Sequence, residues 1–188
     1  MRIVGGSARG RTLATPRSDD VIRPTADRAR ETIFNVLGQS CDGLTVLDLY
    51  AGTGALGLEA VSRGAIKAVL VDKAKEALEL CRQNTATLKF GDRVEIVAGD
   101  ALKIVERLGT EGRVFELVFA DAPYALKVGV AVLEALENAR VVSHEGVAVI
   151  ETAPEEAMPE SHGHFAQIDR RVIGAAAFSI YRLTKADP

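Results

Sequence analysis

An aspartate followed by closely spaced glycines indicates a site for a cofactor that carries a positive charge. The segment 46–57 reads VLDLYAGTGALG, with Asp48 among β-favouring residues and three glycines behind it, Gly52, Gly54 and Gly57. Glycines at this spacing provide the tight turn and close backbone approach with which a buried strand passes into a helix. In a dinucleotide site the loop would hold a pyrophosphate, which a carboxylate at Asp48 would repel. The same carboxylate suits a cationic amino-acid group, so the segment predicts S-adenosylmethionine as the cofactor.

Acidic residues also follow the next two predicted strands. An apolar strand at 66–71 is followed by Asp72, and a strand at 93–98 is followed by Gly99 and Asp100. The carboxyl ends of parallel strands form the edge at which open α/β sheets bind ligands, and an acid at this distance beyond the glycines binds a ribose hydroxyl in such folds. We therefore predict Asp72 as the ribose ligand and assign Asp100 to the adenine side.

The alternative role for each of these acids is a helix cap, because Asp commonly begins the helix that follows a strand. That explanation is preferable for one isolated aspartate, but acids at three successive strand ends favour a cofactor site. The predicted cofactor-binding residues are Asp48, Tyr50, Ala51, Gly52, Gly54, Gly57, Asp72, Lys73, Asp100 and Ala101.

The fourth predicted strand, at 114–120, leads into a segment that suits a methyl acceptor. An exocyclic amine on a base is a poor nucleophile because its lone pair is delocalised into the ring. The Asp121 carboxylate and the Ala122 carbonyl can each accept one N–H and direct the lone pair toward the methyl group. Pro123 stiffens the turn, and Tyr124 offers a ring on which an unpaired base can stack. The alternative is that this segment is an ordinary turn. The glycine loop upstream makes that explanation the weaker one. The predicted catalytic residues are Asp121, Ala122, Pro123 and Tyr124.

The charge is distributed unevenly along the 188 residues. The net charge is −3, yet residues 1–30 hold seven arginines against three aspartates, a local net charge of +4. A basic arm on an acidic body is typical of a nucleic-acid partner, because contacts to phosphates supply most of the non-specific affinity. A solvated tail is the alternative, and Ile3, Val4 and Leu13 favour an ordered arm instead. The predicted RNA-binding residues are Arg2, Arg9, Arg11, Arg23, Arg28 and Arg30.

Other residue types indicate neither a metal nor a membrane. Cys41 and Cys81 form no CxxC motif and are predicted to be buried thiols, while His162 and His164 lie in a loop without spaced partner ligands. No apolar run is long enough to cross a bilayer, and the basic start lacks the apolar core of a signal peptide. We therefore expect a cytoplasmic protein without a metal.

Strands and helices alternate along the rest of the chain. A docking helix is expected from Thr25 to Gly38, and the strands near 44–50, 66–72, 93–98 and 114–120 are separated by predicted helices near 54–64, 74–89 and 101–108. This alternation predicts βαβ crossovers and a mostly parallel sheet that is covered on both faces. A helix near 127–139, a strand at 147–151, and a hairpin from strands at 165–172 and 178–183 complete the sheet, with one reversed strand.

Two further motifs carry a family resemblance. Asp-x-Pro-Tyr at 121–124, after Asp-x-x-x-Gly-x-Gly at 48–54, resembles the amino-group methyltransferases. The stretch RPTADRARETIFN at 23–35, with RIVGG at 2–6 and RGR at 9–11, narrows the resemblance to the RsmD family, which methylates the exocyclic amine of one guanine in small-subunit ribosomal RNA. The similarity runs along nearly the whole chain.

The resemblance implies a Rossmann-like class I methyltransferase with a mostly parallel seven-stranded sheet, helices on both faces, one antiparallel C-terminal strand and an N-terminal basic hairpin. It implies an extension at 1–22 attached to a methyltransferase domain at 23–188, S-adenosylmethionine as the donor, and an assembled or partly assembled small subunit as the partner. The segment 23–35 would lie beside the cofactor and near the RNA. Ala122 replaces the first proline of the family motif, which keeps the carbonyl but relaxes the loop.

Three other functions remain open at this point. Within the same chemistry the acceptor could be a DNA adenine or a protein glutamine, although the chain has no room for a DNA target-recognition domain. From another class, the chain could be a non-catalytic RNA-binding or ribosome-assembly protein that retains the fold. The intact glycines and acids favour an enzyme.

Overall fold

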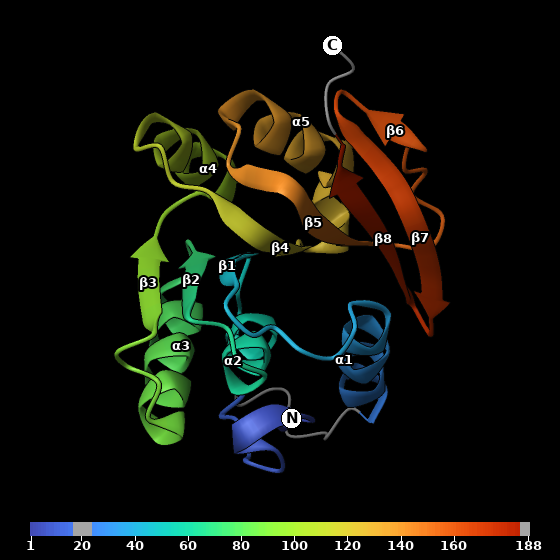
Figure 1. Ribbon diagram of the computed structural model, residues 1–188. Helices are drawn as coiled ribbons and strands as arrows, with labels where there is room; N and C mark the ends of the chain where they lie inside the picture. The colour runs from blue at the N-terminus through green and yellow to red at the C-terminus, as the bar shows by residue number, and fades with distance from the viewer. Residues whose placement is uncertain (17–23, 185–188) are drawn as a thin grey trace.

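The computed structural model describes residues 1–16 and 24–184, which fold around a single mixed sheet (Figure 1). Its strand order is β3-β2-β1-β4-β5-β8-β7-β6. The strands are β1 (Thr45–Leu49), β2 (Lys67–Asp72), β3 (Val94–Ala98), β4 (Phe115–Asp121), β5 (Val142–Thr152), β6 (Ser161–His162), β7 (Phe165–Ile173) and β8 (Ala176–Leu183).

The first five strands are parallel to one another, and β8 pairs with β5 in the antiparallel sense. Seven of the strands are those expected from the sequence, and the two-residue β6 is an eighth that pairs with the start of β7. Strand β5 begins five residues earlier than the predicted 147–151.

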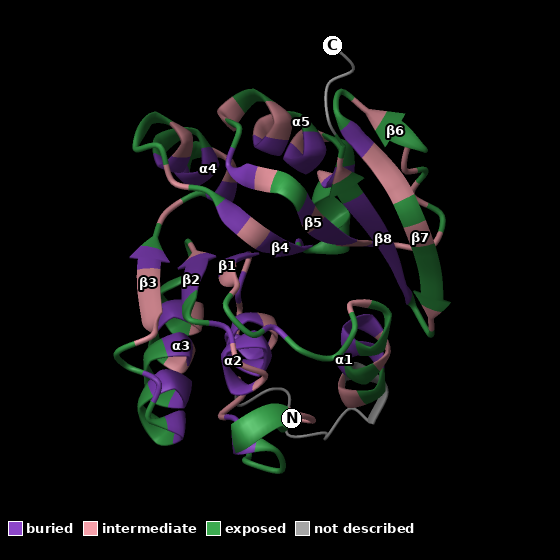
Figure 2. Cartoon of the chain, viewed as in Figure 1, coloured by how far each residue is buried: buried purple, intermediate pink, exposed green. Residues whose placement is uncertain are grey.

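In the described part of the chain, five α-helices cover the two faces of the sheet. One face carries α1 (Pro24–Val36), α2 (Ala55–Ser62) and α3 (Lys75–Leu88), whose buried residues join one hydrophobic cluster. The other face carries α4 (Ala101–Thr110) and α5 (Gly129–Ala139), which pack against a second cluster. Figure 2 shows β1 and β2 almost entirely buried between the two layers. Burial on both faces explains why these strands read as near-continuous apolar runs.

The strand order places a topological switch point between β1 and β4. The chain moves outward from β1 to β3 and then crosses back to β4 on the other side of β1. Open α/β sheets bind ligands at such a point, beyond the carboxyl ends of the strands, because the connections there diverge to opposite faces and leave a crevice. The ends of β1 and β4, which carry the glycine loop and Asp121, meet at this crevice.

Residues 1–13 form a hairpin-like arm, as the family resemblance implied. The Ile3 N–H donates to the Arg11 carbonyl (2.9 Å), and the Leu13 N–H donates to the Met1 carbonyl (3.0 Å). Ile3 and Leu13 are buried in the same cluster as α2, so the arm is ordered and shares the core of the main domain. The proposed boundary between residues 22 and 23 lies outside the described residues.

Candidate active site

Two cavities lie along the carboxyl edge of the sheet. The first has a volume of about 760 Å³ and lies between the glycine loop, α1 and the tip of the β7–β8 hairpin. The second, of about 590 Å³, runs past the ends of β2 and β3. The residues that line both cavities are Tyr50, Gly52, Ala74, Ala77, Asp121, Tyr124 and Glu151. The two cavities therefore meet at the predicted methyl-acceptor segment.

Asp48 lies beneath the first cavity and holds the start of α2. Its Oδ2 accepts the Gly57 N–H at 2.8 Å, and the residue is only 1% exposed. Burial raises the pKa of Asp48 to about 7, the Gly57 N–H opposes this shift, and the charge of Asp72 adds to it. A cation in the cavity would favour the ionised carboxylate, since an opposite charge stabilises the charged form.

The glycine loop has little space for side chains. A Cβ at Gly57 would lie 2.3 Å from Leu70 Cδ2, and Gly54 has a φ of +77° that favours glycine. Tyr50 also has a positive φ, of 60°, which a bulky residue rarely adopts. Such strain is typical of functional sites, and Tyr50 lines both cavities.

Asp72 has a structural role beside the one predicted for it. Its two carboxylate oxygens accept the Gly52 N–H (2.9 Å) and the Ala74 N–H (2.8 Å). The carboxylate therefore ties the glycine loop to the start of α3. Each oxygen retains a second lone pair, and Asp72 lines the second cavity, where the ribose was expected.

Asp100, which we assigned to the adenine side, lines neither of these two cavities, whereas its neighbours in sequence line the second one. Gly99 and Ala101 line the second cavity together with Lys73. Asp100 occupies the N-cap position of α4 but makes no capping hydrogen bond with its side chain. Its Oδ2 lies 3.9 Å from Lys73 Nζ.

The predicted acceptor residues gather at the junction of the cavities. Asp121 ends β4 and is the register partner of Glu151 on β5, and Tyr124 Oη donates to Glu151 Oε1 at 2.6 Å. Asp121 is accessible through the cavity, yet protein surrounds most of its carboxylate. This burial, followed by the charge of Glu151, raises the pKa of Asp121 well above its usual range. Burial also raises the pKa of Glu151. Ala122 and Pro123 line the second cavity.

Sequence analysis missed Glu151 as a site residue. The signal was present, because Glu151 is the last residue of the predicted strand at 147–151, as Asp121 directly follows the strand at 114–120. A second miss is Met1, which lines the first cavity and whose Sδ accepts a hydrogen bond from Thr53 Oγ1 at 3.4 Å. Only the folded chain places Met1 there.

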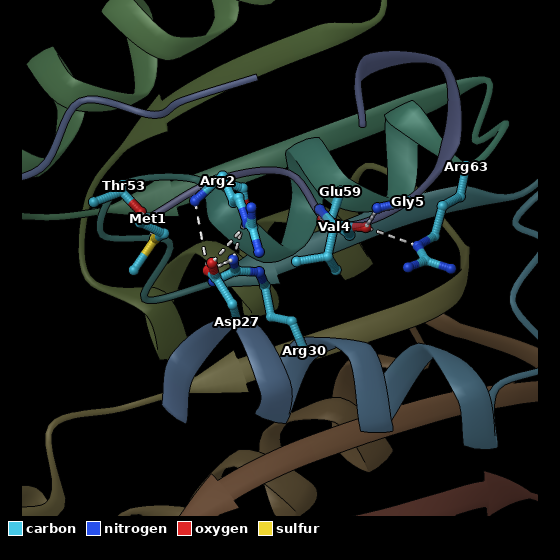
Figure 3. A network of polar contacts seen from close by, with 9 residues as sticks. All are labelled: Met1, Arg2, Val4, Gly5, Asp27, Arg30, Thr53, Glu59 and Arg63. Carbon is cyan, nitrogen blue, oxygen red and sulfur yellow. Dashed lines mark hydrogen bonds and ion pairs between the residues drawn. The ribbon is translucent and has the colours of Figure 1, made fainter. Parts of the chain in front are cut away.

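Figure 3 shows how the arm is held to the main domain. Glu59, fully buried on α2, accepts the N–H groups of Val4 (2.8 Å) and Gly5 (2.7 Å). Its Oε1 also pairs with Arg63 Nε at 2.8 Å. These hydrogen bonds satisfy two backbone donors of the arm, so one buried carboxylate is among the groups that hold the arm in place.

The predicted RNA-binding arginines differ in exposure, and four of the six are exposed. Arg9, Arg11 and Arg28 are exposed, and Arg11 Nη2 donates to the Thr87 carbonyl at 2.8 Å. Arg2 is an exposed partner of Asp27, while Arg23 lies outside the described residues.

Arg30 corrects the prediction, because it is only 5% exposed and cannot present its side chain to an external phosphate. Its Nη2 donates to Asp27 Oδ1 and to the Arg2 carbonyl, both at 2.6 Å. Its Nε has no hydrogen-bond partner among the described residues, and Arg30 lines the first cavity. A buried donor without a partner is costly, so Arg30 stands out among the residues that line the cavity.

The described residues, 1–16 and 24–184, also bear on the predictions for cysteines, metals and membranes. Cys41 and Cys81 are buried free thiols, as predicted. In these ranges no group of three His, Cys, Asp or Glu side chains is arranged to hold a metal ion. None of the helices found there has the length and apolarity to span a membrane.

The parallel sheet, the glycine loop after β1 and the strand-end acids around one edge define the fold of S-adenosylmethionine-dependent, Rossmann-like methyltransferases. The model of the family described as conserved hypothetical protein 95 matches residues 1–182. The chain belongs to that family, which is the RsmD family.

Relatives and solved structures agree with this assignment. Ribosomal RNA small subunit methyltransferase D of Escherichia coli (strain K12) is 34% identical over 182 residues, which cover 97% of this chain and 89% of that protein. The protein of the same name from Haemophilus influenzae is 27% identical, with 97% of this chain and 93% of that protein covered. The solved structure of yhhF from Escherichia coli has a TM-score of 0.86 and 32% identity, with 99% of both chains covered.

Proposed function

We propose that this protein transfers a methyl group from S-adenosylmethionine to the 2-amino group of a guanine in small-subunit ribosomal RNA. One observation carries the proposal: Asp121 and Tyr124 lie at the end of β4 in the same cavity as Asp48 and its glycine loop. The names of the relatives support ribosomal RNA of the small subunit as the substrate. The resemblance of the motif at 121–124 supports an exocyclic amine as the acceptor.

The residues present fit S-adenosylmethionine. Asp48 suits the ammonium group, and Arg30, which lines the same cavity, suits the carboxylate of the same amino-acid end. Asp72 suits a ribose hydroxyl in the second cavity, and Gly99 and Ala101 leave room for the adenine. When bound, the cofactor supplies an electrophilic methyl group on a sulfonium.

The protein then positions the amine and takes up its proton. The Asp121 carboxylate and the Ala122 carbonyl accept the two amine hydrogens, which directs the nitrogen lone pair toward the methyl group. One N–H proton must leave as the new C–N bond forms, and Asp121 is suited to accept it because its pKa is raised. The ring of Tyr124 stacks on the base, which has to be unpaired first.

The test uses small ribosomal subunits that lack the modification. Incubation with labelled S-adenosylmethionine should label a single guanine of the subunit RNA, and nuclease mapping with mass spectrometry would identify the methyl group on N2. A label on adenine or on a protein glutamine would support a different amine acceptor. No label above background with protein that binds the cofactor would support a non-catalytic assembly protein.

A variant at the ribose position gives the first prediction. Asp72→Ala is expected to weaken cofactor binding by roughly 1.5–3 kcal/mol, because a hydrogen bond to a charged group is removed. The same change removes the acceptor of the Gly52 N–H, so Asp72→Asn is the matched control: its amide oxygen keeps one backbone acceptor. Calorimetric titration with S-adenosylmethionine measures both variants. Parent-like affinity in Asp72→Ala would eliminate the ribose role.

The basic arm gives the second prediction. Arg9 and Arg11 are exposed on the arm, and replacing both with Ala should flatten the plot of log affinity for RNA against log salt by roughly 0.7 for each phosphate that is no longer neutralised. The decrease in affinity should be nearly independent of sequence, because protein groups that bind phosphates position the RNA without specifying its bases. Filter binding over a salt series measures the slope.

The matched control replaces Lys103 and Arg107 with Ala. Both are exposed on α4, on the opposite face of the sheet from the arm, and the change removes the same charge. If the slope in the arm variant equals that of this control, the arm arginines only face solvent, and the RNA surface must lie elsewhere, for instance at Arg170, Arg171 and Arg182.

A further inference from the structure

Glu151 is an acidic residue of the active site for which the methyl transfer described above has no use. It is the second-last residue of β5 and lies beside Asp121, its register partner on β4, and both residues line the two cavities. Neighbouring strands lie about 4.8 Å apart. Two carboxylates are therefore presented side by side to whatever occupies the junction of the cavities.

This arrangement is unfavourable for folding alone. Burial raises the pKa of both groups, and the charge of Glu151 raises that of Asp121 further, so holding two ionised carboxylates here costs free energy. Tyr124 Oη donates to Glu151 Oε1 and fixes the direction of the side chain. A carboxylate has about four lone-pair positions, so Glu151 can still accept a hydrogen bond from a ligand.

Adjacent acceptors match one base in particular. Guanine presents the N1–H donor next to its exocyclic 2-amino group, so its edge offers neighbouring donors. Adenine and cytosine also have an exocyclic amine, but the ring nitrogen next to it carries a lone pair. A carboxylate facing that lone pair is repelled, and such a repulsive element gives specificity.

We propose that Glu151 accepts the N1–H of the target guanine while Asp121 and the Ala122 carbonyl accept the hydrogens of its 2-amino group. Glu151 is then the residue that selects guanine, and Tyr124 both stacks on the base and orients Glu151. This inference rests on the proposed function, since it concerns the acceptor of the same methyl transfer.

The experiment compares guanine with 2-aminopurine at the methylated position. 2-Aminopurine keeps the 2-amino group but has a lone pair at N1. RNA with either base at the methylated nucleotide is ligated into small-subunit RNA and assembled, and kcat/KM is measured for the parent and for Glu151→Gln. The amide of Gln can donate to N1, so the preference of the parent for guanine should fall by about tenfold or more in the variant.

The ratio of kcat/KM for guanine RNA to kcat/KM for 2-aminopurine RNA is compared between the parent and Glu151→Gln. The difference between these two ratios isolates the effect of residue 151. Loss of O6 in 2-aminopurine affects parent and variant alike and cancels in the double cycle. Glu134→Gln, an exposed position on α5, makes the same chemical change away from the cavities and should leave the ratio as in the parent. Thermal melting and calorimetric titration with S-adenosylmethionine establish that Glu151→Gln is folded and binds the cofactor.

The outcomes separate the two proposals. Methylation of guanine with the same ratio in Glu151→Gln as in the parent would overturn the role of Glu151 and leave the proposed function intact. Absence of guanine methylation by the parent would overturn the proposed function. If Glu151→Gln methylates neither RNA, the preference for guanine over 2-aminopurine is measured instead as a ratio of equilibrium binding affinities. A binding ratio equal to that of the parent would also reject the inference.

Discussion

Asp121→Ala is expected to lower the rate of methyl transfer by at least about 10²-fold, because the variant lacks both an acceptor for the amine and the group that takes its proton. The backbone carbonyl of Ala122 remains and cannot orient the amine alone. The affinity for S-adenosylmethionine should change little, since the groups suited to the cofactor are Asp48, Arg30 and Asp72. Single-turnover rates with labelled cofactor and calorimetric titration separate the two effects.

Asp121→Asn is the matched variant for this prediction. Asn keeps a carbonyl oxygen that accepts an N–H but cannot take a proton, so its rate should lie between those of the parent and of Asp121→Ala. Full activity in Asp121→Ala would reject the mechanism. Activity equal to the parent in Asp121→Asn would show that positioning matters and that the proton leaves by another route.

The pH dependence follows from the same carboxylates. Burial raises the pKa of both Asp121 and Glu151, and the charge of Glu151 raises that of Asp121 further, so the protonated forms persist to higher pH than in an ordinary carboxyl group. A protonated carboxyl group accepts poorly, and the rate should therefore fall as the pH is lowered through these raised values. The free energy of unfolding changes with pH in the opposite direction from the rate. The raised pKa values stabilise the folded state at low pH, and this stabilisation is lost as the pH rises through them.

Glu59→Ala is expected to lower the free energy of unfolding by roughly 3–5 kcal/mol, because one partner of a buried ion pair is removed. Arg63, whose side chain is 7% exposed, loses its carboxylate, and the backbone N–H groups of Val4 and Gly5 lose their acceptor. For a chain of this size each kcal/mol lowers Tm by about 2–4 °C. Thermal melting followed by circular dichroism measures the change.

The same variant connects stability to the site, because Glu59 is one of the groups that hold the arm. Met1 lines the first cavity from the arm, and limited proteolysis should cleave Glu59→Ala near the N-terminus. Glu134→Ala on the exposed face of α5 is the control, and it should melt like the parent. A parent-like Tm in Glu59→Ala would mean that water replaces the carboxylate at little cost.

Local sequence determined the parts of the site that belong to strand ends. The glycine loop, Asp48, Asp72 and Asp121 were predictable because apolar runs and turn residues mark where each strand ends, and parallel strands bring those ends to one edge. The alternation of strands and helices predicted the parallel sheet for the same reason. The antiparallel hairpin of β7 and β8 was marked by two β-favouring runs around Gly174.

Tertiary structure decided the rest, because it depends on which segments meet in space. The charge of Arg30 suggested that it binds RNA, but packing of α1 against the arm buries it, and the residue lines the first cavity. The ring of Tyr124 was predictable as a stacking surface, whereas the partner of its hydroxyl, Glu151, comes from a strand 27 residues away. A sequence states which side chains carry charge. Burial and long-range pairing exist only in the folded chain. They determine whether a charged side chain contacts solvent, a ligand or another charged group.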